Sequence, residues 1–288
     1  MDLVVRTRSL GTGAEGVPDQ YADGKAAKVW KVCIGDAKQR TQGYKDFLVN
    51  MLRKKGCKRI LDVACGTGID SIMLLEEGFD VVSVDASDKM LKYALKERWN
   101  RRKEATFDNW IIEEANWITL PQDIPHLIGG GFDAVICLGN SFAHIPDNYG
   151  DKREQKEILK NFEQCIKPGG CLLIDHRNYD YILQHGNAPV QCIYYNGEHI
   201  QNITVSVMYV AGKPRMVILD YHVAMDDNES KTDTAEFRLS YYPHLLDEFN
   251  DMLDEVVPYE THTIYGDFKP LDEMKNPGFF IHVLEKKM

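Results

Sequence analysis

The sequence predicts an α/β protein with a mostly parallel main sheet and an inserted antiparallel β segment. From about residue 58 to Asp175, short apolar runs alternate with amphipathic helical patterns, which is typical of parallel strands joined by crossover helices. After Asp175 the runs are β-rich and are joined by loops with Gly, Pro, Asn and Asp, with no helical pattern between them. We therefore expect one parallel sheet and a separate antiparallel meander.

The composition indicates a globular protein with a small-molecule partner. The chain has 288 residues, 44% of them hydrophobic, which suits one large domain carrying an insertion. Its net charge of −10 disfavours nucleic acid and anionic membrane surfaces as partners. The seven cysteines include no Cys-x-x-Cys pair, which predicts reduced thiols. No apolar run reaches the ~18 residues of a membrane span, and no signal peptide is evident, so we expect a cytosolic protein.

The first part of the chain predicts an arm and two helices. Residues 1–20 contain few periodic apolar positions, so we expect an arm that becomes ordered against another surface, such as a second subunit. Apolar residues at helical spacing predict a first helix over residues 21–34. Asp36 is expected to cap a second helix, whose apolar face covers residues 44–52 and which ends at Gly56.

The strands and helices of the main sheet follow in alternation. The expected parallel strands are residues 59–64, 79–85, 110–115, 132–140 and 171–175. The helices between them are expected at residues 68–78, 88–104 (with Ser87 as N-cap) and 151–167. The inserted meander is predicted at residues 203–210, 215–225 and 236–242. A helix over residues 242–256 and a strand over residues 278–286 then return the chain to the main sheet.

The stretch ILDVACGTGIDS, residues 60–71, places a glycine-rich turn between a strand and a helix. Such a turn lets the backbone approach a ligand at the carboxyl edge of a parallel sheet. A dinucleotide fingerprint would need a third glycine where Ser71 stands, and a Walker loop would need a following Lys and Ser or Thr. The turn therefore favours an adenosine without phosphate, with an ordinary tight turn as the alternative.

Two aspartates accompany this turn. Asp85 ends the second predicted strand, where a carboxylate can accept hydrogen bonds from both hydroxyls of a ribose. Its alternative role is to cap the next helix, which Ser87 already does. Asp62 lies inside the first strand, and we expect it to stabilise the backbone of the turn rather than to contact a ligand.

The successive motifs LDVACGTG, SVDAS, EEANW, CLGNSFAH and KPGG resemble those of class I S-adenosylmethionine-dependent methyltransferases. More narrowly, RTRSLG, GVPDQYADG, VWKVCIGD, IDHRNYDYIL and FRLSYYPH resemble the glycine N-methyltransferase family over nearly the whole chain. Ala64 stands where the superfamily motif usually has its first glycine, and Cys33 stands where the family pattern has a tyrosine. The resemblance implies a Rossmann-like sheet whose last strand is antiparallel.

The resemblance implies S-adenosylmethionine as the methyl donor. This donor carries no phosphate, so backbone amides and carboxylates suffice to hold it. Asp85 would bind the ribose, Ala64 and its loop the amino-acid portion, and Leu138 would contribute backbone near the donor. Asn116 and Trp117 would bracket the adenine, although Trp117 alone also fits a core position. The pattern also assigns to the donor pocket Tyr21, Trp30 and Arg40, the last near the methionyl carboxylate.

The resemblance implies glycine as the acceptor. Arg177 directly follows the fifth strand, where a guanidinium can bind a carboxylate bidentately; on sequence alone a surface salt bridge is the alternative. Asn140 follows the fourth strand, and its side-chain carbonyl would orient the amine. Tyr195 and Tyr221 of the inserted segment are assigned to the same pocket. Asn140, Arg177 and Tyr195 are thus the expected catalytic residues. His144 is more typical of a structural position, and no Cys/His pattern predicts a metal.

The implied activity converts S-adenosylmethionine and glycine to S-adenosylhomocysteine and sarcosine, and so would regulate the ratio of the two adenosyl compounds. The resemblance implies a homotetramer whose arms reach neighbouring sites, with 5-methyltetrahydrofolate as an inhibitor at the subunit interface. The expected units are an arm, a donor-binding domain and a substrate subdomain, over residues 1–20, over 21–176 with 244–288, and over 177–243.

Three alternatives stay open. One is a methyltransferase for another small amine, such as sarcosine or dimethylglycine. Another is a protein that binds S-adenosylmethionine or folate with little turnover. A nicotinamide-dependent dehydrogenase is the weakest alternative, because Ser71 interrupts its fingerprint.

Overall fold

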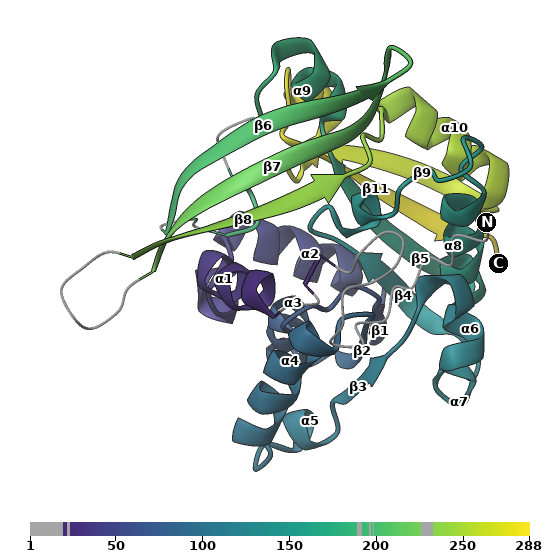
Figure 1. Cartoon of the computed structure of the whole chain (residues 1–288). Coiled ribbons are helices and arrows are strands. Elements are labelled where there is room, and N and C mark those ends of the chain that lie inside the picture. The colour runs from purple at the N-terminus through teal and green to yellow at the C-terminus, as the bar shows by residue number, and fades with distance from the viewer. Residues whose placement is uncertain (1–19, 22–23, 189–191, 196, 198, 226–232) are drawn as a thin grey trace.

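The computed structural model describes residues 20–21, 24–188, 192–195, 197, 199–225 and 233–288. The predicted arm therefore lies almost entirely outside the described residues. Figure 1 shows a large sheet with helices on both of its faces and a smaller sheet that lies above α1 (Lys25–Ile34). Within the described part of the chain, no helix has the length and apolar character needed to cross a membrane.

The main sheet has eight strands in the order β10-β9-β11-β5-β4-β1-β2-β3. The strands that pair in parallel are β1 (Arg59–Asp62), β2 (Asp80–Asp85), β3 (Ile111–Glu114), β4 (Phe132–Cys137) and β5 (Ile166–Arg177). Those that pair antiparallel are β9 (Tyr259–Gly266), β10 (Lys269–Pro270) and β11 (Phe279–Lys286). The predicted fold class, with an antiparallel last strand, is confirmed.

Two antiparallel strands at the edge of this sheet were not expected from the sequence. The outer positions of β9 are polar and exposed, so this segment carries no apolar run that would mark it as a strand. β10 has two residues and pairs only with β9 in the described sheet. The expected final strand, β11, lies between β9 and β5 rather than at the edge.

Helices cover both faces of the main sheet, because its central strands are buried on both sides. Ile60 belongs to the core on the side of α2 and α3, and the next residue, Leu61, belongs to the core on the side of α8 and α10. The helices are α2 (Gln42–Lys54), α3 (Ile69–Glu76), α4 (Asp88–Asn100), α5 (Ala105–Asp108), α6 (Leu120–Asp123), α7 (Pro125–Ile128), α8 (Arg153–Gln164), α9 (Tyr179–His185) and α10 (Leu246–Val256).

Helix boundaries follow local capping. Ser87 accepts a hydrogen bond from the Met90 backbone N–H at 3.4 Å and begins α4, as expected. Asp36 caps a short 3₁₀ helix, η1 (Ala37–Gln39), and not α2, because Thr41 lies closer to α2 and its side chain caps that helix. α1 begins at Lys25 after Gly24, whose φ of 72° is left-handed, and not at Tyr21.

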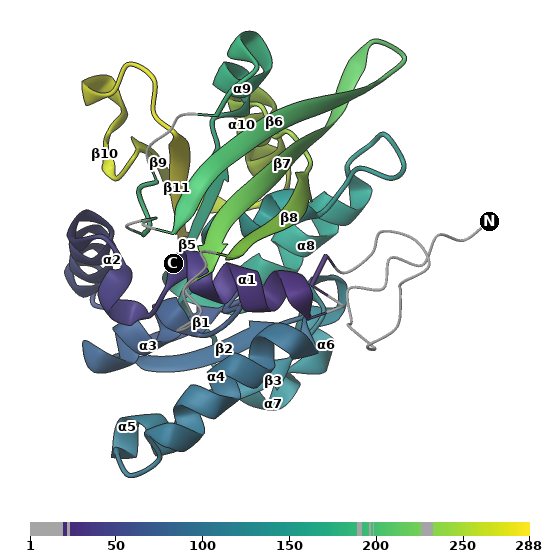
Figure 2. The ribbon, with the colours of Figure 1, turned by 60° about the vertical axis from the view of Figure 1, so that its left-hand side comes forward.

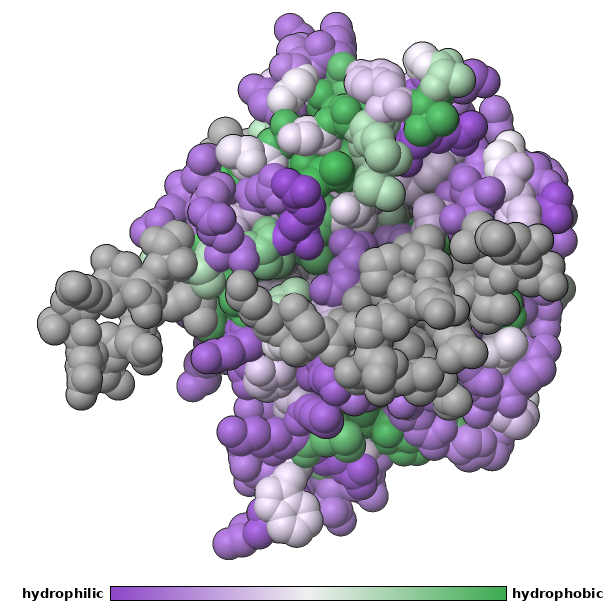
Figure 3. Space-filling view, viewed as in Figure 1, coloured by the Kyte–Doolittle hydropathy of each residue, from purple (hydrophilic) through white to green (hydrophobic). Residues whose placement is uncertain are grey.

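The smaller sheet contains β6 (Ile200–Val210), β7 (Lys213–Met225) and β8 (Asp233–Tyr241), paired antiparallel in that order. Figure 2 shows α1 between this sheet and the strands β1 and β2, and α1 packs against β7 and β8. Outside its grey parts, Figure 3 shows a mostly hydrophilic face, with hydrophobic residues gathered in the upper part, where the small sheet lies, and again near the lower centre.

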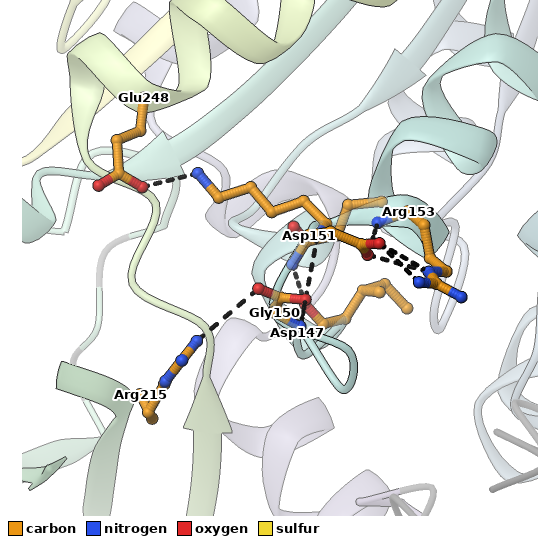
Figure 4. A network of polar contacts seen from close by, with 9 residues as sticks. Asp147, Gly150, Asp151, Arg153, Arg215 and Glu248 are labelled. Carbon is orange, nitrogen blue, oxygen red and sulfur yellow. Dashed lines mark hydrogen bonds and ion pairs between the residues drawn. The ribbon is translucent and has the colours of Figure 1, made fainter. Parts of the chain in front are cut away.

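Ion pairs join the small sheet and α10 to the loop before α8 (Figure 4). Asp147 accepts hydrogen bonds from the backbone N–H groups of Gly150 and Lys152 at 2.7 and 3.1 Å. Its other oxygen lies 3.7 Å from Nη1 of Arg215 in β7. The Lys152 ammonium lies 2.6 Å from Glu248 in α10. The loop beside the carboxyl edge of β4 is thus tied to two later parts of the chain.

Candidate functional site

A cavity of about 210 Å³ lies at the carboxyl ends of β1, β2, β4 and β5. Its floor is the turn after β1, and its walls come from α1, from the ends of these strands and from the small sheet. Most of the residues expected at the site line it: Tyr21, Trp30, Arg40, Ala64, Asp85, Trp117, Leu138, Arg177 and Tyr195. Three others, Asn116, Asn140 and Tyr221, are not among the described lining residues; Asn140 and Tyr221 contact Arg177, which is.

The turn after β1 requires glycine at two positions. Gly66 and Gly68 have φ values of 53° and 85°, which L-residues with a Cβ rarely adopt. A Cβ at Gly68 would lie 2.6 Å from the Trp110 ring, so the helix α3 can approach this ring only with glycine there. The turn exposes its backbone to the cavity, as the ligand-binding interpretation requires.

Asp85 connects this turn to the end of β2. One carboxylate oxygen accepts the Gly66 N–H at 2.9 Å, and the other accepts the Ser87 N–H at 2.9 Å. The half-buried side chain also lines the cavity. Asp85 therefore fixes the turn and presents negative charge to the place where a ribose was expected.

Asp62 stabilises the turn from below, as expected. It accepts a hydrogen bond from the Ser71 hydroxyl at 2.6 Å and from the Ala64 N–H at 3.3 Å. Burial raises the pKa of Asp62 to about 7. Ser71 in turn accepts from the Ser83 hydroxyl at 2.7 Å. The residue that interrupts the dinucleotide fingerprint is thus a buried part of the turn's support.

The two residues expected at the adenine differ in placement. The Trp117 ring lines the cavity, and its Nε1–H donates to the Val63 carbonyl at 2.6 Å. The Asn116 side chain instead accepts the Ile118 N–H at 2.9 Å and caps η2 (Trp117–Thr119). Asn116 therefore shapes the short helix that carries Trp117.

Arg40 already has a carboxylate partner. Its Nε and Nη2 lie 2.8 and 2.9 Å from the two oxygens of Asp70 in the first turn of α3. Its backbone forms an antiparallel bridge with Tyr195. Arg40 thus brings a neutralised guanidinium to the cavity and joins the N-terminal helices to the segment that carries Tyr195.

Arg177 lines the cavity and makes no ion pair within the described residues, although its charge acts on buried Asp175. Its Nη2 donates to the Tyr221 hydroxyl at 3.4 Å, and its guanidinium lies 4.7 Å from the centre of the Phe279 ring. Its Nε is buried and makes no hydrogen bond in the described structure. Because arginine stays charged in proteins, this side chain is a buried cation with donors to spare.

Asn140 holds the backbone beside Arg177. Its side-chain carbonyl accepts the Arg177 N–H at 2.9 Å, and its amide contacts the Tyr179 hydroxyl at 2.9 Å. Its own N–H donates to buried Asp175 at 2.8 Å, which supports its left-handed φ of 66°. Asp175 also accepts from the Tyr194 hydroxyl at 2.5 Å, and burial raises its pKa to about 7.

Sequence reasoning missed the hydrogen bonds that join two lining residues, Gln20 and His144, to the small sheet. The Gln20 amide donates to Nδ1 of His144 at 2.9 Å and to the Ser240 carbonyl at 2.9 Å. Nδ1 of His144 therefore accepts, and the proton of the neutral ring is on Nε2. Burial lowers the pKa of His144 to about 4. These residues come from three distant segments, so no local pattern in the sequence joins them.

Cys33, whose position departs from the family pattern, is buried in the core and is 3% exposed. Cys192 lines the cavity on the same side as Tyr195. All seven cysteines are free, and six are buried. The expectation of reduced thiols agrees with this arrangement.

The comparisons with known proteins agree with this geometry. A family profile described as a methyltransferase domain matches residues 61–172, from β1 to β5. The glycine N-methyltransferase of Rattus norvegicus is 57% identical over 292 residues, which cover 99% of each chain. The chain belongs to the glycine N-methyltransferase family.

Two further matches show the similarity of this chain to more distant methyltransferases. A glycine/sarcosine N-methyltransferase of Halorhodospira halochloris is 34% identical over 93% of this chain and 90% of that one. The crystal structure of an S-adenosylmethionine-dependent methyltransferase from Clostridium acetobutylicum ATCC 824 has a TM-score of 0.64 at 16% identity, covering 91% of this chain and 96% of that one. The second match shows that the fold is shared.

The chain is an S-adenosylmethionine-dependent methyltransferase of this family, and its cavity suits that donor. Among the described lining residues, Arg40 and Arg177 are the cations, and no lysine is present for a phosphate. Asp85 and Trp117, which the sequence analysis expected at a ribose and an adenine, both line the cavity.

Proposed function

We propose that this chain transfers the methyl group of S-adenosylmethionine to the amino group of glycine, giving sarcosine and S-adenosylhomocysteine. The observation that carries the proposal is the Arg177 guanidinium, a buried cation at the cavity without a carboxylate partner in the described structure. A carboxylate on the acceptor would supply the missing charge and accept the unused N–H groups.

The surroundings of Arg177 favour a small acceptor. The Trp30 ring centre lies 6.0 Å from that of Tyr195 and 5.9 Å from that of Tyr221, so aromatic rings fill this side of the cavity. Burial raises the pKa of Tyr195 well above 10, which keeps its phenol neutral. Its hydroxyl oxygen complements a positive sulfonium without acting as a base. Tyr221 acts through its contact with Arg177.

The donor side of the cavity would hold S-adenosylmethionine through six residues. We assign Asp85 to the ribose, Trp117 to the adenine, and Ala64 and Leu138 to the amino-acid portion and the backbone near it. Arg40 and Tyr21 close the N-terminal side, and Asn116 positions Trp117 through its cap of η2. Trp30, which the resemblance assigned to the donor pocket, packs against Tyr195 and Tyr221, and so borders both sides of the cavity in this proposal. The donor supplies a methyl group on a sulfonium, which leaves as a neutral thioether.

The chain's own residues then align the acceptor and exclude water. Arg177 fixes the carboxylate, so the neutral amine is directed toward the donor side of the cavity. Asn140 holds the Arg177 backbone through the hydrogen bond to its N–H. His144 is not assigned as the base, because its Nδ1 accepts from Gln20 and its Nε2 carries a proton. The proton of the methylated amine is released to water.

A substrate panel tests this proposal. The purified chain is incubated with methyl-labelled S-adenosylmethionine and glycine, sarcosine, dimethylglycine or ethylamine, and the products are separated. We expect label in sarcosine and none in the product of ethylamine, which lacks the carboxylate. Preferential labelling of another amine would contradict glycine as the substrate, and absence of turnover with intact donor binding would identify a binding protein instead.

We further propose that the chain forms a cytosolic homotetramer in which residues 1–20 reach neighbouring sites. In this proposal 5-methyltetrahydrofolate is an inhibitor that binds at the subunit interface. The enzyme would set the ratio of S-adenosylmethionine to S-adenosylhomocysteine. The support is the family relationship. Residues 1–19 lie outside the described residues. Light scattering should give four times the 32.9 kDa chain mass, and deletion of residues 1–19, which retains Gln20, should lower turnover. A monomer with full activity after the deletion would contradict this assembly.

A further inference from the structure

Three histidines form a hydrogen-bonded row across three neighbouring strands. His176 is in β5, His282 in β11 and His262 in β9. Nε2 of His176 lies 3.1 Å from Nε2 of His282, and Nδ1 of His282 lies 2.9 Å from Nε2 of His262. At the inner end of the row, Nδ1 of His176 lies 2.9 Å from the carbonyl oxygen of Arg177.

The partner of each nitrogen determines the tautomer of every ring. A carbonyl oxygen only accepts, so Nδ1 of His176 carries a proton and its Nε2 accepts. Nε2 of His282 must then donate to His176, which leaves Nδ1 of His282 as the acceptor for Nε2–H of His262. All three hydrogen bonds therefore point in one direction, from the edge of the sheet toward the carbonyl of Arg177.

The environment keeps these rings neutral. His176 and His282 are fully buried, and their ring centres lie 4.7 and 5.0 Å from that of Phe249 in α10. Burial lowers the pKa of His176 to about 4 and that of His282 well below 6.5. The other titratable groups that act on the row are His244, beside His176, and Asp254 of α10, near His262.

A neutral row that ends on a carbonyl does not carry protons to the cavity, because that oxygen cannot pass one on. What it can do is hold the backbone. The Arg177 N–H is already fixed by Asn140, and its carbonyl is fixed by His176. The backbone N–H and carbonyl of Arg177, the last residue of β5, are thus both hydrogen-bonded to side chains of other residues.

We infer that the His262–His282–His176 row is a positioning device for Arg177, which keeps the long guanidinium side chain directed into the cavity. This inference rests on the proposed role of Arg177 as the receptor for the acceptor carboxylate. A small rotation of the backbone at Arg177 moves its guanidinium by much more than its Cα. Loss of the row should therefore weaken glycine binding while the donor side stays unchanged.

The test compares two substitutions of His282. His282→Leu removes both hydrogen bonds, whereas His282→Gln keeps an amide N–H at the level of Nε2 and an acceptor for His262. We expect His282→Leu to raise the KM for glycine about tenfold, with kcat and donor affinity within about twofold of wild type. His282→Gln should restore most of the glycine affinity. His126→Leu is the matched control, since that exposed ring pairs with Glu113 at the β3 edge of the sheet.

A second readout does not depend on turnover. In ¹⁵N-labelled wild-type protein, imidazole shifts should show His176 protonated on Nδ1 and His282 protonated on Nε2. The opposite tautomer of either ring would overturn the row. An unchanged glycine KM in His282→Leu, in a protein whose wild type methylates glycine, would overturn the positioning role and leave the proposed function intact. A wild type without glycine turnover would instead contradict the proposed function.

Discussion

The donor side and the acceptor side of the cavity are built in different ways. Most of the donor side comes from residues 60–117, where Asp85 binds the backbone of Gly66 and Ser87 within the same region. The acceptor side collects α1, the end of β5 and the small sheet around Arg177, whose Nε has no partner in the described structure. On the donor side the Thr67 hydroxyl is the buried group of the turn without a partner in the described structure, whereas the acceptor side contains a buried charge that a ligand would have to satisfy.

The largest expected effect comes from Arg177. Arg177→Ala should lower kcat/KM for glycine by about 10²–10³-fold, because a buried charge pair with the substrate is lost. Donor affinity, measured by isothermal titration, should stay within about twofold. Arg177→Lys keeps the charge without the planar fork and should recover only part of the loss. Equal losses of donor and glycine affinity would show that the two sides are not separable.

Gly68→Ala should have the next largest effect, on stability and on the donor side. The new Cβ would lie 2.6 Å from Trp110 at a φ of 85°, so we expect a loss of about 2–4 kcal/mol in the free energy of unfolding. Gly78→Ala is the matched control, since Gly78 has the same φ of 85° and a Cβ there meets nothing within 4 Å. Urea denaturation of both variants measures the difference. A Gly68→Ala protein as stable as wild type would contradict the close packing of the turn.

Asp85→Ala should weaken donor binding and leave glycine binding nearly unchanged, which is the reverse of the effect expected for Arg177→Ala. The variant loses the acceptor for two backbone N–H groups and the carboxylate assigned to the ribose, so the Kd of S-adenosylmethionine should rise about 10- to 100-fold. The KM for glycine at saturating donor should change by less than about threefold. Donor binding by an intact Asp85→Ala protein at wild-type strength would exclude the ribose assignment.

Buried His244 lies on the side of the sheet behind Arg177, and its protonation makes the stability of the protein depend on pH. Burial lowers the pKa of His244 well below 6.5, so the unfolded chain takes up a proton below about pH 6.5 that the folded chain does not. Stability from this residue is therefore present above that pH and is lost as the pH falls. His244→Phe should fit among Phe142 and Phe249 and remove this linkage.

Between about pH 6.5 and 5, the free energy of unfolding of wild type should fall by up to about 1.4 kcal/mol per pH unit more than that of His244→Phe. Chemical denaturation at several pH values measures this slope. Buried Asp62 and Asp175, whose pKa values are raised to about 7, act with the opposite sign in both proteins and cancel in the comparison. Parallel pH profiles of the two proteins would contradict the neutral state of His244.

The smallest expected effect concerns the ion pair between the small sheet and the loop before α8. Arg215→Gln removes a contact of 3.7 Å to Asp147 with the arginine partly exposed, so its stability effect should be below about 1 kcal/mol. The KM for glycine should rise by less than about threefold, and donor affinity should not change. A larger change in donor affinity would show that the small sheet also shapes the donor side.

The difference between the donor side and the acceptor side also explains which features the sequence could predict. The turn, Asp85, Trp117 and the parallel strands lie in local patterns of the sequence. The structure confirms the parallel strands and places Asp85 and Trp117 in the lining of the cavity. Arg177 could be placed at the sheet edge from the sequence, but its lack of a partner is a property of the tertiary structure. Local patterns gave no sign that Asn140 would hold a backbone.

Contacts between distant segments could not be predicted. Gln20 joins His144 and Ser240 across separations of 124 and 220 residues, and no spacing rule relates such positions. The row of histidines depends on β11 lying between β5 and β9, an arrangement that the sequence did not indicate. Both features lie on the acceptor side or behind it, where separate parts of the chain meet.

The most direct test of the central claim is a crystal structure with S-adenosylhomocysteine and glycine bound. We expect the glycine carboxylate to lie within about 3 Å of the Arg177 guanidinium, with the glycine amine directed toward the sulfur of the adenosyl compound. A glycine carboxylate bound elsewhere, with Arg177 paired to a carboxylate of the protein, would contradict the role of Arg177 as the acceptor's binding residue.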